Sequence, residues 1–181
     1  METSFILKTL PALTLAAQII FVITLLLYIL SEKAKARITQ FIKTRALLLA
    51  FFVALAGTLG SLFYSEVAGY EPCRLCWYQR IFLYPNVILL GLALYKKDKG
   101  IIPYGITLSI VGGAIAFYHY LIQRGIAPEL PCSAVGYSTS CAQIFVMSYG
   151  YITIPLMALT AFVFILSILI LGRENKPRAT G

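Results

Sequence analysis

Long apolar stretches alternate with short polar segments along the chain. Five of the stretches are about long enough to cross a bilayer, because a helix needs roughly 20 apolar residues to span the hydrocarbon core. They run from about Leu10 to Leu30, Ala46 to Tyr64, Trp77 to Leu94, Ile101 to Ile122 and Tyr151 to Leu171. The pattern predicts five membrane-spanning helices, since a barrel would show segments of about ten residues with alternating hydrophobicity.

The predicted protein is all-α and forms one domain. We expect an extra amino-terminal transmembrane helix, a basic cytoplasmic loop, a bundle of four transmembrane helices and a cytoplasmic tail. Their ranges are 1–30, 31–45, 46–171 and 172–181. Pro85 and Pro155 fall within the third and fifth stretches, and we expect each of them to kink its helix.

Composition agrees with a membrane protein. Hydrophobic residues make up 60% of the chain and charged residues 12%, whereas a soluble domain has about 25% charged residues. The polar residues are too few to cover the interior of a soluble globule, and the chain is too apolar for disorder. The net charge of +8 comes from short basic runs between apolar stretches. This argues against a nucleic-acid partner and leaves the lipid bilayer as the surrounding medium.

The basic residues are distributed unequally between the two sides of the membrane. If all five stretches cross it, 11 of the 15 basic residues lie on one side, after the first, third and fifth stretches. Lys8, Arg74, Arg80 and Arg124 lie on the other side. The positive-inside rule then predicts an external amino terminus and a cytoplasmic carboxyl terminus.

A cleaved signal peptide is an alternative interpretation of the first stretch, with residues 34–36, Ala-Lys-Ala, as its cleavage site. The apolar run is long for a signal peptide, and its stronger basic flank follows the run instead of preceding it. Both features favour an uncleaved helix.

The four cysteines all fall on the predicted outer side. Cys73 and Cys76 lie between the second and third stretches, and Cys132 and Cys141 lie between the fourth and fifth. An even number of cysteines on the non-cytoplasmic face indicates paired cysteines in an oxidising compartment. Two structural disulfides are the simplest interpretation of this distribution.

The spacing of the first pair favours redox chemistry. A Cys-x-x-Cys disulfide closes a very short loop and therefore contributes little stability, while the same spacing is typical of redox dithiols. Cys76 is expected to begin a helix, where the backbone N–H groups and the helix dipole favour a thiolate. Arg80 follows on the same helical face, one turn deeper, so we expect it to stabilise an anion. The alternative is that Arg80 extends to the lipid head groups.

Zinc binding is a weaker interpretation of the four cysteines. The second pair has eight residues between its cysteines and no histidine close in sequence, unlike common zinc-ligand spacings. We therefore expect no metal.

Two segments carry a family resemblance. The sequence Cys-Arg-Leu-Cys-Trp-Tyr-Gln-Arg at residues 73–80, followed by a second outer cysteine pair, resembles the DsbB family of membrane disulfide-formation proteins. The close spacing of the second pair and the sequence of residues 76–82 are most similar to the BdbC branch. The resemblance covers roughly residues 45–171. It implies a four-helix bundle in the bacterial cell (inner) membrane that reoxidises a soluble, extracytoplasmic DsbA-like thioredoxin-fold protein. The electrons would pass to a membrane quinone, ubiquinone or menaquinone.

The resemblance also assigns roles to individual residues. Cys73 and Cys76 match the pair next to the quinone, and Cys132 and Cys141 match the pair that meets the soluble partner. Arg80 matches the arginine of the quinone site.

Two features fit the family less closely. His119 resembles the family histidine near the outer end of the following helix and is expected at the quinone site, although a lone helical histidine is often structural. Residues 1–30 add a helix before the usual four.

Two other functions remain open at this point. One is a quinone reductase of the vitamin K epoxide reductase type, although the chain shows no fused thioredoxin domain. The other is a small membrane scaffold or transporter subunit with two static disulfides. Redox titration distinguishes a scaffold with static disulfides from the two enzymes, because static disulfides resist reduction at glutathione potentials.

Overall fold

The computed structural model describes residues 2–128 and 139–173, which contain five α-helices and no strand. The helices are α1 (Glu2–Leu30), α2 (Glu32–Leu62), α3 (Arg74–Lys96), α4 (Ile102–Gln123) and α5 (Ile154–Gly172). A π-helical turn, η1 (Phe63–Val67), continues α2, and a 3₁₀ turn, η2 (Lys99–Ile101), precedes α4. The predicted all-α class is confirmed.

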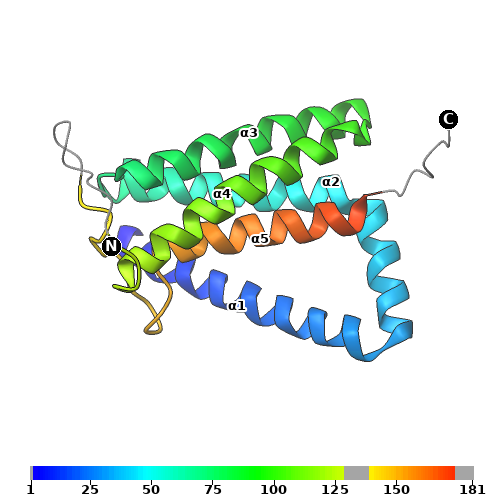
Figure 1. The fold of residues 1–181 in the computed structure, drawn as a ribbon, viewed down its shortest axis with the longest axis horizontal. Coiled ribbons are helices and arrows are strands. Elements are labelled where there is room, and N and C mark those ends of the chain that lie inside the picture. Colours follow the sequence, from blue (N-terminus) through cyan, green and yellow to red (C-terminus); the bar gives the residue numbers. More distant parts are fainter. Residues whose placement is uncertain (1, 129–138, 174–181) are drawn as a thin grey trace.

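Helices α2 to α5 form a four-helix bundle (Figure 1). The longest interfaces join α5 to α2 and to α4. The buried core contains small and large apolar residues from all four helices: Ala50, Ala54, Leu83, Leu90, Ile102, Ala116, Phe162, Ile165 and Leu169. Gly112 shows how closely α4 and α5 approach, because a Cβ there would collide with the ring of Phe162. Small residues of this kind permit close packing of membrane helices.

Helix α1 lies beside the bundle and packs against α2 and α5 (Figure 1). Most of its side chains are apolar, and many of these are exposed, including Ile20, Leu26 and Leu30. An exposed apolar surface of this length is what a lipid-facing helix requires.

The third predicted stretch differs from the others. In the described residues, four helical segments are long and apolar enough to cross a membrane, and they lie on α1, α2 with η1, η2 with α4, and α5. Helix α3 has 23 residues but is not one of the four. Its polar residues Gln79, Arg80 and Asn86 are buried inside the bundle. The chain is a multi-pass membrane protein whose third helix carries polar groups inward.

Residues 31–45 do not form the predicted loop. They contain the first turns of α2, which cross the end of the bundle before the helix turns along it (Figure 1). Ser31 caps this helix by accepting a hydrogen bond from the backbone N–H of Ala34 at 3.3 Å. Residues 32–56 contain neither glycine nor proline, and Ala, Lys, Arg, Gln and Glu are good helix formers. The basic residues therefore lie on a helix.

Pro155 does not kink α5. The helix begins at Ile154, so the proline lies in its first turn, where a missing backbone N–H costs nothing. Pro85 does lie inside α3.

The two cysteine-bearing loops and the amino-terminal end of α1 lie at one end of the bundle (Figure 1). The α3–α4 connection and the end of α5 lie at the other end. We expect single cysteines introduced within 33–45 to stay unlabelled by an impermeant thiol reagent on intact cells, and those within 133–140 to react. The native cysteines are replaced for this test. Labelling of 33–45 from outside would contradict the orientation given by the positive-inside rule.

Candidate active site

The Cys73–Cys76 pair lies at the amino-terminal end of α3. Cys73 is the N-cap residue and Cys76 lies in the first turn, so the helix itself brings the two sulfur atoms to 3.3 Å. Cys73 is buried and Cys76 is half-buried. The pair is a dithiol in which the Cys73 S–H donates a hydrogen bond to Cys76 Sγ.

This hydrogen bond makes the two thiols unequal. Both residues precede the apolar stretch 77–94. Donation to Cys76, together with burial, raises the pKa of Cys73 to about 12. The same hydrogen bond lowers the pKa of Cys76, and a backbone hydrogen bond from Cys73 and the charge of Arg80 lower it further against the effect of burial. Cys76 is therefore the thiol of the pair that ionises more readily.

Arg80 lies one turn below Cys76 and is only 8% exposed. Its Nε donates to Ser61 Oγ at 3.0 Å and its Nη2 donates to the Ser61 carbonyl oxygen at 3.1 Å. The guanidinium also lies 5.0 Å from the ring centre of Trp77. No carboxylate in the described part of the chain pairs with Arg80. The site thus contains a buried positive charge that is held in place by neutral groups.

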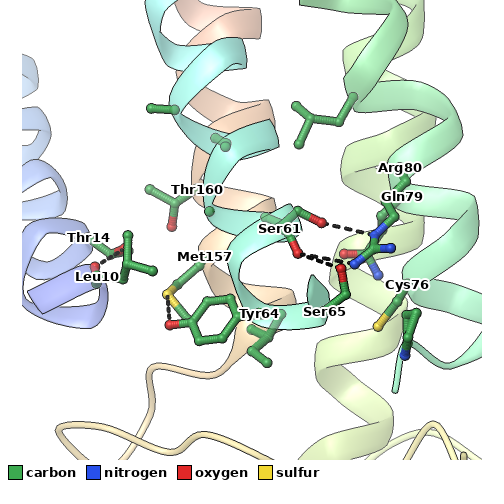
Figure 2. A pocket seen from close by; sticks show the side chains of 18 of the residues that line it. Leu10, Thr14, Ser61, Tyr64, Ser65, Cys76, Gln79, Arg80, Met157 and Thr160 are labelled. Atoms are coloured by element: carbon green, nitrogen blue, oxygen red, sulfur yellow. Dashed lines mark hydrogen bonds between the residues drawn. The ribbon is translucent and has the colours of Figure 1, made fainter. Parts of the chain in front are cut away.

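A cavity of about 410 Å³ lies beside these groups, between α1, α2, α3 and α5. Cys76 and Arg80 line it together with mainly apolar residues (Figure 2). Three stacked aromatic rings line its loop end: Tyr64 and Tyr70 are 6.1 Å apart, and Tyr70 and Phe145 are 5.0 Å apart. The cavity can hold a flat, largely apolar molecule next to a thiolate and a cation.

The role of His119 at the quinone site stays a prediction. His119 does not line the cavity but lies behind the sulfur pair, with Nε2 3.6 Å from Cys73 Sγ and 3.0 Å from the carbonyl oxygen of Cys141. Its Nδ1 lies 2.9 Å from Gln79 Nε2, which also donates to the Leu75 carbonyl oxygen. With the Gln79 amide in this orientation, Nδ1 accepts and Nε2 carries the proton. His119 therefore links the first cysteine pair to the loop that carries Cys141.

Cys141 is fully buried and packs in one cluster with Cys73, Leu75 and Ile122. Its loop is attached to α4 by a hydrogen bond from Gln123 Nε2 to the Gln143 carbonyl oxygen at 3.0 Å. Cys132 lies outside the described residues, so its pairing with Cys141 stays a prediction. The structure does bring Cys141 next to the first pair.

Cys73, Cys76 and His119 could also hold a metal ion, because their ligand atoms all lie within 4.8 Å of one another. A structural zinc site usually has four protein ligands, and the described residues of this cluster supply three. The expectation that no metal binds here stays a prediction.

Sequence reasoning did not identify Ser61 or Gln79. Ser61 lies on α2 and fixes Arg80 from a neighbouring helix, and Gln79 fixes the ring of His119. The one available signal was their polarity within apolar stretches.

Comparison with known proteins shows the family of the chain. Residues 43–172 match the family model described as "Disulfide bond formation protein DsbB". The "SPbeta prophage-derived disulfide bond formation protein B" of Bacillus subtilis (strain 168) is 48% identical over 130 residues, covering 72% of this chain and 86% of that protein. "Disulfide bond formation protein C" of the same strain is 38% identical over 129 residues, covering 70% of this chain and 91% of that protein. No solved structure gives a significant match. The chain therefore belongs to the DsbB family of disulfide bond formation proteins, in its BdbC branch.

Proposed function

We propose that the protein oxidises a soluble thioredoxin-fold partner outside the cytoplasm of a bacterial cell and passes the electrons to a membrane quinone. Membership of the family supports disulfide bond formation, an oxidoreductase activity. The quinone part of the proposal rests on one observation. Cys76, the more readily ionised thiol of the pair, and Arg80 line the same apolar cavity.

The cavity suits a quinone ring. Its volume of about 410 Å³ falls within the range of small-molecule sites, roughly 300–1,000 Å³. Arg80 donates hydrogen bonds from Nε and Nη2 to Ser61, so its Nη1 can donate to a carbonyl oxygen of the quinone ring. The apolar walls would hold the ring and its tail. A quinone, when bound, takes up two electrons and two protons and leaves as a quinol.

The thiol chemistry begins at the second cysteine pair. A partner thiolate attacks Cys132 Sγ and breaks the Cys132–Cys141 disulfide, so that Cys141 leaves as a thiolate. The second partner thiol then displaces Cys132 and completes the partner's disulfide. Two electrons now reside on Cys132 and Cys141. The burial of Cys141 supports this order, because an external protein does not reach a buried sulfur directly.

Transfer to the first pair follows by the same exchange. The Cys141 thiolate attacks Cys73 Sγ of the oxidised pair, and Cys76 leaves as the thiolate beside Arg80. Cys132 then attacks Cys141, which restores the second disulfide and releases Cys73 as a thiol. We assign His119 to this step instead of to the quinone, because its Nε2–H reaches both Cys73 Sγ and the Cys141 carbonyl oxygen.

The direct test uses the purified protein in liposomes with a reduced thioredoxin-fold partner and a short-chain quinone. We expect one quinol to form for each partner disulfide, over many turnovers. Two static disulfides would give no turnover, and quinone reduction from small dithiols without any partner oxidation would favour the vitamin K epoxide reductase type. Stoichiometric zinc on the isolated protein would also contradict the proposal.

A further inference from the structure

Helix α1 lies outside the family match, which covers residues 43–172. Nevertheless Leu10, Leu13, Thr14 and Ala17 of α1 line the cavity that also contains Cys76 and Arg80. We propose that α1 is the outer wall of the quinone site and determines how tightly the quinone is held. This inference rests on the proposed function.

The four residues form one face of the helix. Their spacing of three, four and seven residues places them on the same side of α1. Figure 2 shows Leu10 and Thr14 on the opposite side of the cavity from Arg80 and Cys76. The Thr14 hydroxyl donates to the Leu10 carbonyl oxygen at 3.0 Å, within the helix. The face that α1 offers to a ligand is therefore apolar.

Three contacts fix the rotation of α1 relative to α5 and the segment just before it. Gln18 Nε2 donates to Thr160 Oγ1 at 2.8 Å, and Gln18 Oε1 accepts from the Tyr151 hydroxyl at 2.9 Å. One turn further along, the rings of Phe21 and Phe164 stack at 4.9 Å. A polar side chain with both ends bonded is a specific contact between membrane helices. Thr160 and Phe164 themselves line the cavity, so the contacts that position α1 belong to the same wall.

The hydrogen bonds that hold α1 in place are different from those that hold the redox groups. In the residues that the structure describes, α1 makes no hydrogen bond to Cys76, Arg80 or Ser61. A change in the wall should therefore alter the binding of the quinone and leave thiol–disulfide exchange with the partner unaffected.

Two adjacent alanines provide a matched test. Ala17 lines the cavity, whereas Ala16 is exposed and does not line it. We expect Ala17→Phe to raise the quinone concentration for half-maximal rate by about tenfold or more, a typical effect of altered pocket shape. Ala16→Phe should stay within about twofold of the unchanged protein, as surface substitutions usually do. Both variants should oxidise the first equivalent of partner at the unchanged rate.

A binding measurement complements the kinetics. Trp77 is the only tryptophan of the chain and its ring lies 5.0 Å from the Arg80 guanidinium, so its fluorescence reports a quinone beside Arg80. Quenching by a short-chain quinone should require the same higher concentration in Ala17→Phe. If this variant fails to accumulate, Ala17→Leu takes its place with a smaller shift in the same direction.

The outcomes separate this inference from the proposed function. If the Ala16 and Ala17 variants reduce quinone with the same half-maximal quinone concentration, α1 is not the wall of the quinone site. The proposed function is unaffected by that result. An unchanged protein that reduces no quinone and shows no quenching would overturn both.

Discussion

Replacing Cys76 by serine is expected to stop the protein after it has oxidised one equivalent of partner. The Cys132–Cys141 disulfide can still react once, because it does not involve Cys76. The electrons cannot then leave, since the remaining Cys73 cannot form a disulfide with a serine. A hydroxyl is also not ionised at neutral pH, and the thiolate is the reacting species of this site. Quinone reduction should fall to the background rate.

The measurement is partner oxidation followed over time at a tenfold excess of reduced partner. The first equivalent serves as the control for folding, since a misfolded variant would not react with the partner at all. Several equivalents oxidised by Cys76→Ser would show that the electrons take a route that avoids Cys76.

Replacing Arg80 by methionine is expected to slow quinone turnover on the order of a hundredfold or more, the usual effect of losing one preorganised charged donor. Methionine fills similar space without the charge, so the bundle and the reaction with the partner should persist. Arg80→Lys should recover part of the rate, because a compact ammonium cannot reproduce the planar donor that bonds Ser61 at two atoms.

The pH dependence provides a second measurement on the same variant. Cys76 acts as a thiolate, so turnover is lost as the pH falls through the pKa of Cys76. The charge of Arg80 lowers that pKa, and its removal should move the acid limb of the pH–rate profile to higher pH. Arg74→Met is the matched control, since Arg74 is exposed and lies between the two cysteines. Unchanged turnover, quinone affinity and pH profile in Arg80→Met would contradict a role of Arg80 in quinone reduction.

Relationships within one helix were predictable from the sequence. The apolar stretches predicted the helix ends to within three residues, except for the starts of α1 and α2, because a membrane requires a minimum apolar length. The four-residue spacing of Cys76 and Arg80 placed them on one face of α3, and both line the cavity.

Relationships between helices were not predictable. Ser61 accepts a hydrogen bond from Arg80, which lies 19 residues later in the chain and on another helix. Helical periodicity predicts contacts within one helix but not between two helices. The contact between His119 Nε2 and Cys73 Sγ likewise joins two residues that are 46 positions apart in the chain. The prediction of a loop at residues 31–45 was wrong for a simpler reason. A basic segment between apolar stretches suggests a connection, although its residue types favour a helix.

The two hydrogen bonds of Gln18 also constrain the order in which the molecule is assembled. Gln18 and Thr160 are 142 residues apart in the chain. At a synthesis rate of about 5–20 residues per second, about 7 s or more pass between the appearance of the two residues at the ribosome. During that time α1 is already made but lacks the partner that fixes its rotation. Helix α1 therefore obtains this contact only after α5 has entered the membrane, and the same step supplies the part of the cavity wall that α5 contributes.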